Sequence, residues 1–408
     1  MGSSHGKAVT SAALKNLVRI EERDAAVLGW VHIDKVAVQM PGSEAGTLSG
    51  LTVGIKDVID VAGMVTSYGS SIFANNKAGK DAEAVHRLRA AGAIILGKTV
   101  TAEFATYSPG PTVNPRKQGH TPGGSSSGSA AVVADGQADI ALGTQTAGSM
   151  IRPASFCGTL GFKPSFGRYP LDGVLETSPN LDTLGVFAAT LDHLLRSDAV
   201  LSEETDCPVA NPAPVIGLCR SPAWDLAEPV MQQVLIDFAN KLRAAGLSVV
   251  EHILPTACDT LLDAHALIHR REAWMTLGHI RDAHSDQVSA VFRDFIDQGG
   301  RDSEAHYQAA LDCQMACQAL LPTIFDGVNM LLVPGAAGPA PEGLGTTGNP
   351  AFQRIWTALG VPCLGFPAAW QANGLPLGLQ IIGQKGQDRQ FLADAQNIIA
   401  HAALKTEE

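Results

Sequence analysis

Segments with helical periodicity alternate with short apolar runs along most of this chain. Residues 82–92 (AEAVHRLRAAG) have the spacing of an amphipathic helix, and the apolar run AIILG follows at residues 93–97. The same order recurs at residues 230–246 with 247–254, and at residues 303–321 with 328–334. Such alternation is typical of α/β proteins whose strands pair in a parallel or mixed sheet. We therefore expect an α/β fold.

One polar stretch could divide the chain. Between about residues 200 and 215 the sequence is rich in proline and acidic residues, and strand-like character resumes in PVIGLC at residues 214–219. A linker between domains and a surface connection inside one domain fit this pattern equally well. The length of 408 residues allows either organisation.

Composition and charge exclude several classes of function. The chain is 45% hydrophobic and 17% charged, which is typical of a compact enzyme. Its formal charge is −11 and it has no basic cluster, so we expect no nucleic-acid partner. No apolar run approaches the roughly 18 residues that span a bilayer, and no signal peptide is recognisable, so we expect a cytoplasmic protein without membrane contact. Residues 1–6 resemble a tag remnant and are left out of the fold argument.

The 7 cysteines are scattered and odd in number, which favours reduced thiols over a disulfide framework. Cys313 and Cys317 lie one helical turn apart, but no second Cys/His pair has metal-site spacing. We interpret them as buried thiols and expect neither a metal nor a cofactor.

Three patterns match known motifs only by letter. Residues 92–99 (GAIILGKT) fit a phosphate-binding loop, but their middle positions are apolar and strand-forming, so we predict a strand. Residues 124–128 (GSSSG) fit a nucleophile elbow, yet no buried strand precedes them. His265 and His269 have zincin spacing, but Ala266 replaces the catalytic glutamate, which favours packing or surface roles.

A serine-rich stretch and a later loop carry the chemical signal. Residues 119–131 (GHTPGGSSSGSAA) could be a flexible linker, a phosphate cradle or a set of serines that share one proton transfer. At residues 138–158 an apolar strand runs into a loop of small residues that ends at Ser149. Small residues let consecutive N–H groups converge on one point, which is the geometry of an oxyanion hole.

A serine nucleophile needs a base, and the loop contains no histidine. Lys56 follows an apolar strand, where its amine can be buried among neutral groups. Burial without a carboxylate lowers a lysine pKa from about 10.4, so the amine could accept a proton. If Lys56 and Ser149 do not touch, a hydroxyl from the serine-rich stretch could relay the proton.

Several segments in order resemble the amidase signature family. They are GIKDVID (54–60), PGGSSSGSAA (122–131), GTQTAGS (143–149), RPASFCG (152–158), GFKPS (161–165), and the C-terminal segments 347–367 and 374–383. The resemblance covers most of the chain and is weaker between about residues 200 and 325. It implies one large mixed β-sheet covered on both faces by α-helices, formed by a single domain over residues 1–408 with a helix-rich, variable part at 200–325.

The resemblance also implies a Ser-cisSer-Lys triad. Ser149 matches the nucleophile, Lys56 the base, and Ser125 the bridging serine, whose preceding peptide bond is cis in the family. The implied oxyanion donors are the N–H groups of Thr146, Ala147, Gly148 and Ser149, and the implied supporting hydroxyls are those of Ser126 and Thr144.

Two departures from the family pattern bear on specificity. The family often has Asp and Gly where this chain has Gln145 and Ala147, and its arginine lies one position earlier than Arg152. The variant resembles malonamidases, in which the equivalent arginine recognises a substrate carboxylate. Arg152 either binds substrate in this way or supports the loop through internal hydrogen bonds, and both readings stay open.

These patterns predict a cofactor-independent amidohydrolase that cleaves a small carboxamide by acyl transfer and releases ammonia or an amine. The expected partner is a small-molecule amide, and a homodimer is open as the assembly. The alternatives are the glutaminase subunit of a tRNA-dependent amidotransferase, a hydrolase of aryl amide, carbamate or urea-type bonds, and a non-catalytic binding scaffold.

Overall fold

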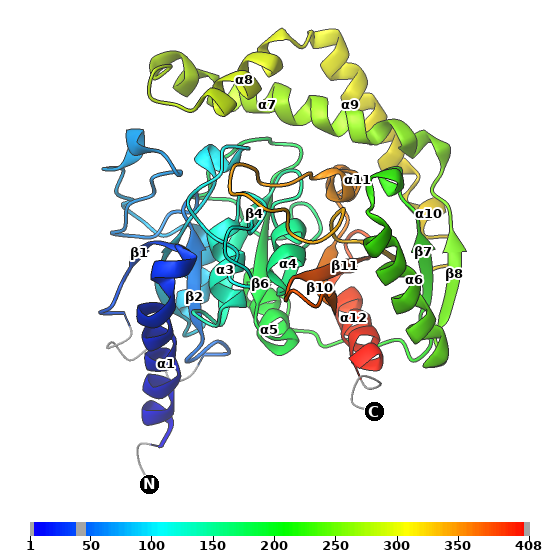
Figure 1. The fold of residues 1–408 in the computed structure, drawn as a ribbon, viewed down its shortest axis with the longest axis horizontal. Coiled ribbons are helices and arrows are strands. Elements are labelled where there is room, and N and C mark those ends of the chain that lie inside the picture. The colour runs from blue at the N-terminus through cyan, green and yellow to red at the C-terminus, as the bar shows by residue number, and fades with distance from the viewer. Residues whose placement is uncertain (1–3, 38–45, 404–408) are drawn as a thin grey trace.

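One mixed sheet of 11 strands runs through the computed structural model, which describes residues 4–37 and 46–403 (Figure 1). The strand order is β1-β3-β2-β4-β6-β5-β10-β11-β9-β7-β8. The strands are β1 (Trp30–Ile33), β2 (Thr52–Lys56), β3 (Ile94–Thr99), β4 (Ile140–Gln145), β5 (Leu160–Lys163), β6 (Thr183–Ala188), β7 (Val215–Cys219), β8 (Ser248–His252), β9 (Met330–Pro334), β10 (Cys363–Trp370) and β11 (Pro376–Ile382).

Both kinds of strand pairing occur in this sheet. Strands β3, β2 and β4 are parallel to one another, as are β9, β7 and β8, and the strands between these groups pair antiparallel. The predicted parallel or mixed sheet is therefore confirmed. Residues 92–99, which match the phosphate-loop pattern, contain the whole of the buried strand β3, as predicted.

Helices cover both faces of the sheet. The main helices are α1 (Ser4–Val27), α2 (Glu83–Ala90), α3 (Ser127–Ala134), α4 (Ile151–Cys157), α5 (Leu191–Ser202), α6 (Pro229–Ala244), α7 (Leu261–Ala283), α8 (Ala290–Arg301), α9 (Glu304–Ala319), α10 (Leu321–Ile324), α11 (Ala351–Leu359) and α12 (Asp388–Ala403). Side chains alternate along a strand, and in β4 Ala141 packs with α3 and α4 while Leu142 joins the core that contains α2, α5, α6 and α12. The predicted α/β architecture is confirmed.

The polar stretch near residue 210 does not separate two sheets. It leads from α5 to β7, and β7 joins the same sheet through β9. It is therefore a surface connection between elements of one sheet. Of the residues set aside as tag-like, 4–6 begin α1, and 1–3 lie outside the described residues.

Helices α7, α8 and α9 form a separate layer along one side of the molecule, with α11 between α7 and the sheet (Figure 1). We call α7–α9 the cap. The first turn of α1 and the last turn of α12 lie on the side away from the cap (Figure 1). Within the described ranges, none of the helices has an apolar stretch long enough to cross a membrane.

Candidate active site

Two neighbouring strands bring the proposed base and nucleophile to one edge of the sheet. Strand β2 ends at Lys56, and the adjacent parallel strand β4 ends at Gln145, directly before the loop that carries Ser149. Because parallel neighbours end at the same edge, segments almost 90 positions apart in sequence meet there. This is the edge that the cap and α11 cover (Figure 1).

Lys56 is fully buried and contacts only neutral hydroxyls. Its Nζ lies 2.8 Å from Ser125 Oγ and 2.7 Å from Thr144 Oγ1. Burial lowers the pKa of Lys56 to about 7, and the negative charge of Asp182 opposes this effect. Lys98, also buried, differs because its Nζ lies 3.1 Å from Asp57 Oδ1 in an ion pair. Lys56 is thus suited to accept a proton near neutral pH.

The peptide bond before Ser125 is trans, so the expected cis bond is a wrong prediction. No peptide bond in residues 4–37 or 46–403 is cis. Instead, Gly123 and Gly124 turn the chain with φ values of 81° and 63°, in the left-handed region that glycine adopts without strain. A Cβ on Gly124 would lie 3.0 Å from the Cα of Ser149, so glycine also permits this close approach.

The same turn places Ser125 beside Ser149. The backbone N–H of Ser125 donates to Ser149 Oγ at 2.9 Å. The hydroxyls of Ser125 and Ser149 form no hydrogen bond with each other in the described part of the chain. Lys56, Ser125 and Ser149 therefore lie together as the sequence predicts, and the contact between the two serines is made through the backbone.

The loop after β4 directs its N–H groups to one side. The carbonyl of Thr146 accepts from His265 Nε2 at 2.9 Å, and that of Ala147 accepts from Thr357 Oγ1 at 3.0 Å. In a trans peptide the N–H of the next residue points opposite to the carbonyl. The N–H groups of Ala147 and Gly148 therefore point away from His265 and Thr357, and neither has a hydrogen-bond partner among the described residues.

Gln145, one of the departures from the family pattern, supports this loop. Its Oε1 accepts from the N–H groups of Met150 and Ile151 at 2.9 and 3.2 Å, where α4 begins. Its Nε2 donates to Thr357 Oγ1 at 3.0 Å. The substitution is visible in the sequence, but this role is not.

The two predicted supporting hydroxyls differ in position. Ser126 Oγ donates to the carbonyl of Thr144 at 3.1 Å and accepts from its N–H at 3.2 Å, so it anchors β4 to the start of α3. Thr144 is closer to the chemistry than expected, because its own hydroxyl contacts the amine of Lys56.

Asp182 is a buried acid that sequence reasoning missed. It accepts from Thr146 Oγ1 at 2.5 Å and from the N–H groups of Thr177 and Ser178 at 2.7 and 2.9 Å. Burial raises its pKa to about 6, although these hydrogen bonds and the charge of Lys56 lower it. No motif marks this residue in the sequence.

Arg152 is only 2% exposed and has no acidic partner within the described part of the chain. Its Nε donates to the carbonyl of Thr347 at 2.6 Å, while its Nη1 is buried without a hydrogen-bond partner. Both readings of Arg152 therefore have a structural basis. The Nε of its guanidinium supports the loop that contains Thr347, and its Nη1 has no hydrogen-bond partner among the described residues.

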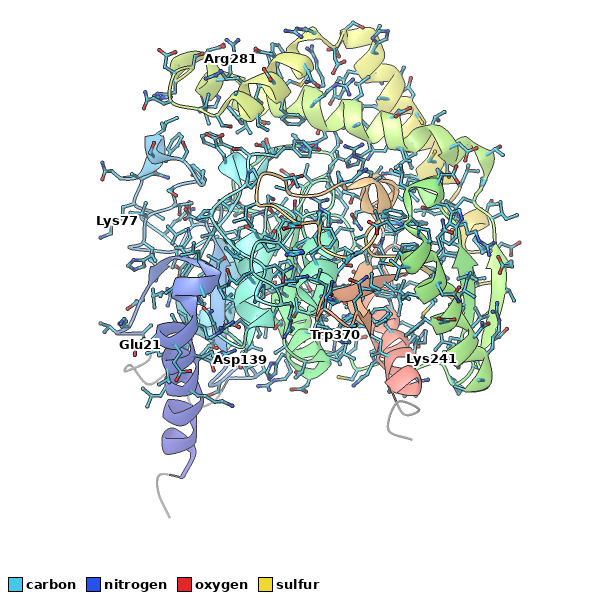
Figure 2. All side chains as sticks on the ribbon, in the orientation of Figure 1. Glu21, Lys77, Asp139, Lys241, Arg281 and Trp370 are labelled. Atoms are coloured by element: carbon cyan, nitrogen blue, oxygen red, sulfur yellow. The ribbon has the colours of Figure 1, made fainter. Side chains whose placement is uncertain are left out.

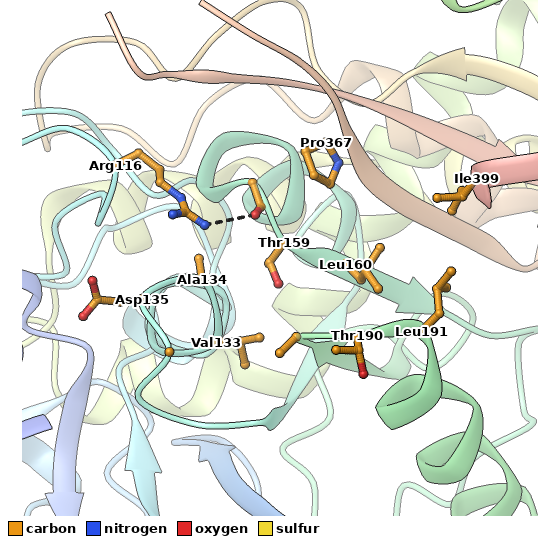
Figure 3. A pocket seen from close by; sticks show the side chains of 13 residues that line it. Arg116, Val133, Ala134, Asp135, Thr159, Leu160, Thr190, Leu191, Pro367 and Ile399 are labelled. Carbon is orange, nitrogen blue, oxygen red and sulfur yellow. Dashed lines mark hydrogen bonds between the residues drawn. The ribbon is translucent and has the colours of Figure 1, made fainter. Parts of the chain in front are cut away.

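A large pocket lies away from this site. A depression of about 590 Å³ opens at the other end of β4, where Figure 3 shows Arg116, Asp135, Thr159 and Thr190 around it. A smaller cavity of about 80 Å³ is lined by Thr144, Thr177 and Asp182, beside the amine of Lys56. Position relative to Lys56, rather than size, identifies the second cavity as part of the candidate site.

The remaining motif candidates are two histidines and two cysteines. His265 and His269, for which packing or surface roles are predicted, are buried in α7. Cys317 is buried and Cys313 partly exposed, and both are free thiols. Over residues 4–37 and 46–403, no group of three or more His, Cys, Asp or Glu side chains could hold a metal ion.

Comparison with known proteins identifies the family. The Amidase family model matches residues 23–392. With the mixed sheet and the clustered Lys56, Ser125 and Ser149 already described, this match means that the chain belongs to the amidase signature family, whose members act on C–N bonds. The resemblance stated from the sequence is confirmed.

Individual relatives differ in their named activities. A glutamyl-tRNA(Gln) amidotransferase subunit from Koribacter versatilis is 31% identical and covers 93% of this chain and 88% of its own length. A 2-amino-5-chloromuconic acid deaminase of Comamonas testosteroni is also 31% identical, over 88% of this chain and 83% of its own. The crystal structure of an amidase superposes with a TM-score of 0.85 at 27% identity over 94% of both chains.

Proposed function

We propose that this protein is an amidohydrolase in which Ser149 attacks the carbonyl of a small amide. One observation carries the proposal: Lys56 is a fully buried amine with no carboxylate contact, and its Nζ lies 2.8 Å from the hydroxyl of Ser125. A neutral amine in that position can take up the proton that a serine nucleophile must lose.

The proposed proton path runs through Ser125, whose Oγ contacts Lys56 Nζ and whose N–H contacts Ser149 Oγ. Since Ser149 Oγ accepts from the N–H of Ser125, its own proton remains available for transfer. As Ser149 Oγ bonds to the amide carbon, its proton passes to Ser125 Oγ, and the proton of Ser125 passes to Lys56 Nζ. The ammonium of Lys56 then returns a proton through Ser125 to the leaving nitrogen, which departs as ammonia or an amine. Water releases the acyl group by the same steps.

The loop after β4 supplies the stabilisation of the tetrahedral intermediate. The N–H groups of Thr146, Ala147, Gly148 and Ser149 are the proposed donors. Fixed donors of this kind act where negative charge develops, and removal of one typically costs about 3 kcal/mol. The hydrogen bonds from His265 and Thr357 to the loop carbonyls support this arrangement because they fix the orientation of the peptide planes.

Arg152 suggests that the substrate carries a carboxylate. Its buried Nη1 has no partner, and a guanidinium in that state is stabilised by an anion that it can hold bidentately. The name of the Comamonas testosteroni relative, a deaminase of a muconic acid, is consistent with an acidic substrate.

Substitution of Arg152 tests this substrate class. Arg152→Ala should lower kcat/KM for dicarboxylic acid monoamides by roughly 10- to 100-fold more than for neutral amides of similar size. Arg152→Lys should restore only part of the loss, because lysine lacks the planar fork. The panel includes aryl amides, carbamates and ureas. Equal losses on charged and neutral substrates, together with a lower Tm, would show that Arg152 only supports the loop.

A glutaminase component of a larger enzyme is the second candidate, favoured by the names of several relatives. That activity would make the chain one member of a multi-chain enzyme and a protein associated with tRNA. Affinity purification from the native source separates the two candidates. Recovery of the chain alone or as a homodimer, with hydrolysis by the purified chain, supports the amidohydrolase. Stable partner chains that are required for glutamine hydrolysis would support the second candidate.

A further inference from the structure

A second arginine without an acidic partner lies near Arg152. Arg354 comes from the first turn of α11, and its guanidinium forms no ion pair or hydrogen bond with any described residue. Its Nε is buried without a partner, as is Nη1 of Arg152. Arg281, which is partly exposed like Arg354, contacts both Asp282 and Asp297.

Helix α11 places this arginine at the catalytic loop. A Cβ on Gly148 would lie 2.6 Å from Arg152 Nη1 and 2.7 Å from Gln353 Oε1, so these two side chains converge on the loop. Thr357, one turn after Gln353, donates to the carbonyl of Ala147. Successive helical residues are rotated by about 100°, so Arg354 projects within about 60° of Thr357, on the side toward α7.

The facing side of α7 carries neutral donors. The pKa values of His265 and His269 are lowered chiefly by burial, and the positive charge of Arg354 adds to this effect in both. Burial is also the main cause that lowers the pKa of Arg152, and the positive charge of Arg354 lowers it further. Nδ1 of His269 lies 3.3 Å from the hydroxyl of Tyr107, and its Nε2 is buried without a partner.

The buried acids of this region do not neutralise the two arginines. Asp182 is occupied by three hydrogen-bond donors, as described above. Glu272, on α7, accepts from Ser178 Oγ, Asn180 Nδ2 and Tyr307 Oη. Arg152 is buried and Arg354 is partly buried, with its Nε enclosed, and neither has an acidic partner among the described residues. Positive charge that is withdrawn from water without compensation is costly, so the arrangement is stabilised when an anionic ligand supplies the missing charge.

We propose that Arg354 and Arg152 together form a subsite for an acyl group with two anionic groups, one held by each guanidinium, with His269 Nε2 as a further donor to the group on Arg354. This inference rests on the proposed function and narrows its substrate class to monoamides that keep two free carboxylates. Arg354 is then a specificity-determining residue in addition to Arg152.

A charge-graded substrate series tests the subsite. We expect the wild-type protein to prefer a tricarboxylic acid monoamide over a dicarboxylic acid monoamide and a neutral amide of similar size, measured as kcat/KM at constant ionic strength. Arg354→Gln should reduce the preference for the tricarboxylic over the dicarboxylic monoamide by roughly 10- to 100-fold. Arg354→Lys should recover part of it.

Arg281→Gln is the control, because it removes one positive charge from the cap at a distance from the site. Figure 2 shows Arg281 at the outer side of the cap. This control should leave the preference unchanged. A wild-type protein without preference for two carboxylates, or an Arg354→Gln variant that loses all substrates equally, would overturn the subsite.

A binding measurement separates the subsite from the reaction. Calorimetric titration of the Ser149→Ala variant with the tricarboxylic monoamide requires no amide cleavage. When Arg354→Gln is added to the Ser149→Ala variant, the Kd for the tricarboxylic monoamide should rise by roughly 10-fold or more. If that shift occurs while the wild-type protein cleaves no amide, the subsite stands and the proposed reaction is wrong. If amides are cleaved but Kd does not respond to Arg354, the reaction stands and the subsite is wrong.

Discussion

At the scale of single residues, the amine of Lys56 determines the pH dependence that we expect. Burial lowers its pKa to about 7, and only the neutral form accepts a proton. The rate kcat/KM should therefore rise about tenfold per pH unit below pH 7 and level off above it. Asp182→Asn removes the charge that raises this pKa, so its acid limb should move to lower pH. A profile of the variant that moves to higher pH would contradict this assignment.

Ser149→Ala should abolish turnover and leave the fold intact, since it removes the nucleophile and little volume. Amide hydrolysis by the purified variant and its thermal unfolding curve are the two measurements. Residual hydrolysis of substantial rate, with contaminating wild-type protein excluded, would require a different nucleophile.

Lys56→Ala should be more damaging than Ser125→Ala. Without the amine the proton path has no terminal acceptor, so we expect kcat to fall by roughly 10²- to 10⁴-fold. Ser125→Ala keeps the backbone N–H that contacts Ser149 Oγ. Measurement of kcat at pH 8 for both variants checks which substitution is more damaging. Near wild-type activity of Lys56→Ala at neutral pH would indicate another base.

The sequence predicts the residues with the most distinctive motifs and misses those that act through them. Lys56, Ser125 and Ser149 follow from three short segments. Thr357 and Arg354 do not, because their importance depends on which helix packs against the loop after β4. Contacts between segments about 200 positions apart have no local signal in a single sequence.

At the scale of elements, α11 acts as the support of the catalytic loop. Thr357→Val removes the hydroxyl that donates to the carbonyl of Ala147 and accepts from Gln145. Leaving these buried groups unsatisfied should cost about 1–3 kcal/mol. We expect a lower Tm and about a tenfold lower kcat.

Thr159→Val is the control for this effect, since Thr159 is a buried threonine whose hydroxyl donates to the carbonyl of Ala188 beside the distant pocket. It should lower Tm without the loss in kcat. If both variants reduce kcat equally, the contribution of α11 is general stability rather than loop orientation.

Helices and strands were predicted correctly where the spacing of apolar residues was clear. The helix and strand predicted at residues 82–97 are α2 and β3. The prediction of a cis peptide bond before Ser125 was wrong, because two consecutive glycines with left-handed φ values produce the turn with trans peptide bonds. The glycines were visible in the sequence, but their φ values were not.

At the scale of the whole molecule, metal removal should have no effect. Dialysis against EDTA is expected to leave amide hydrolysis and Tm unchanged, because the proposed chemistry uses only side chains and backbone N–H groups. Loss of activity that one particular divalent metal restores would show that the proposed mechanism is incomplete.

Strands β10 and β11 have a position with consequences for synthesis. They are the last strands in the sequence, yet they lie in the middle of the sheet, between β5 and β9. Lys56, Ser125 and Ser149 all leave the ribosome long before them. Until β10 and β11 insert, the two parts of the sheet have no strand to join them, and the preceding helix α11 cannot orient the loop after β4. We therefore expect amide cleavage to begin only after β10 and β11 have joined the sheet.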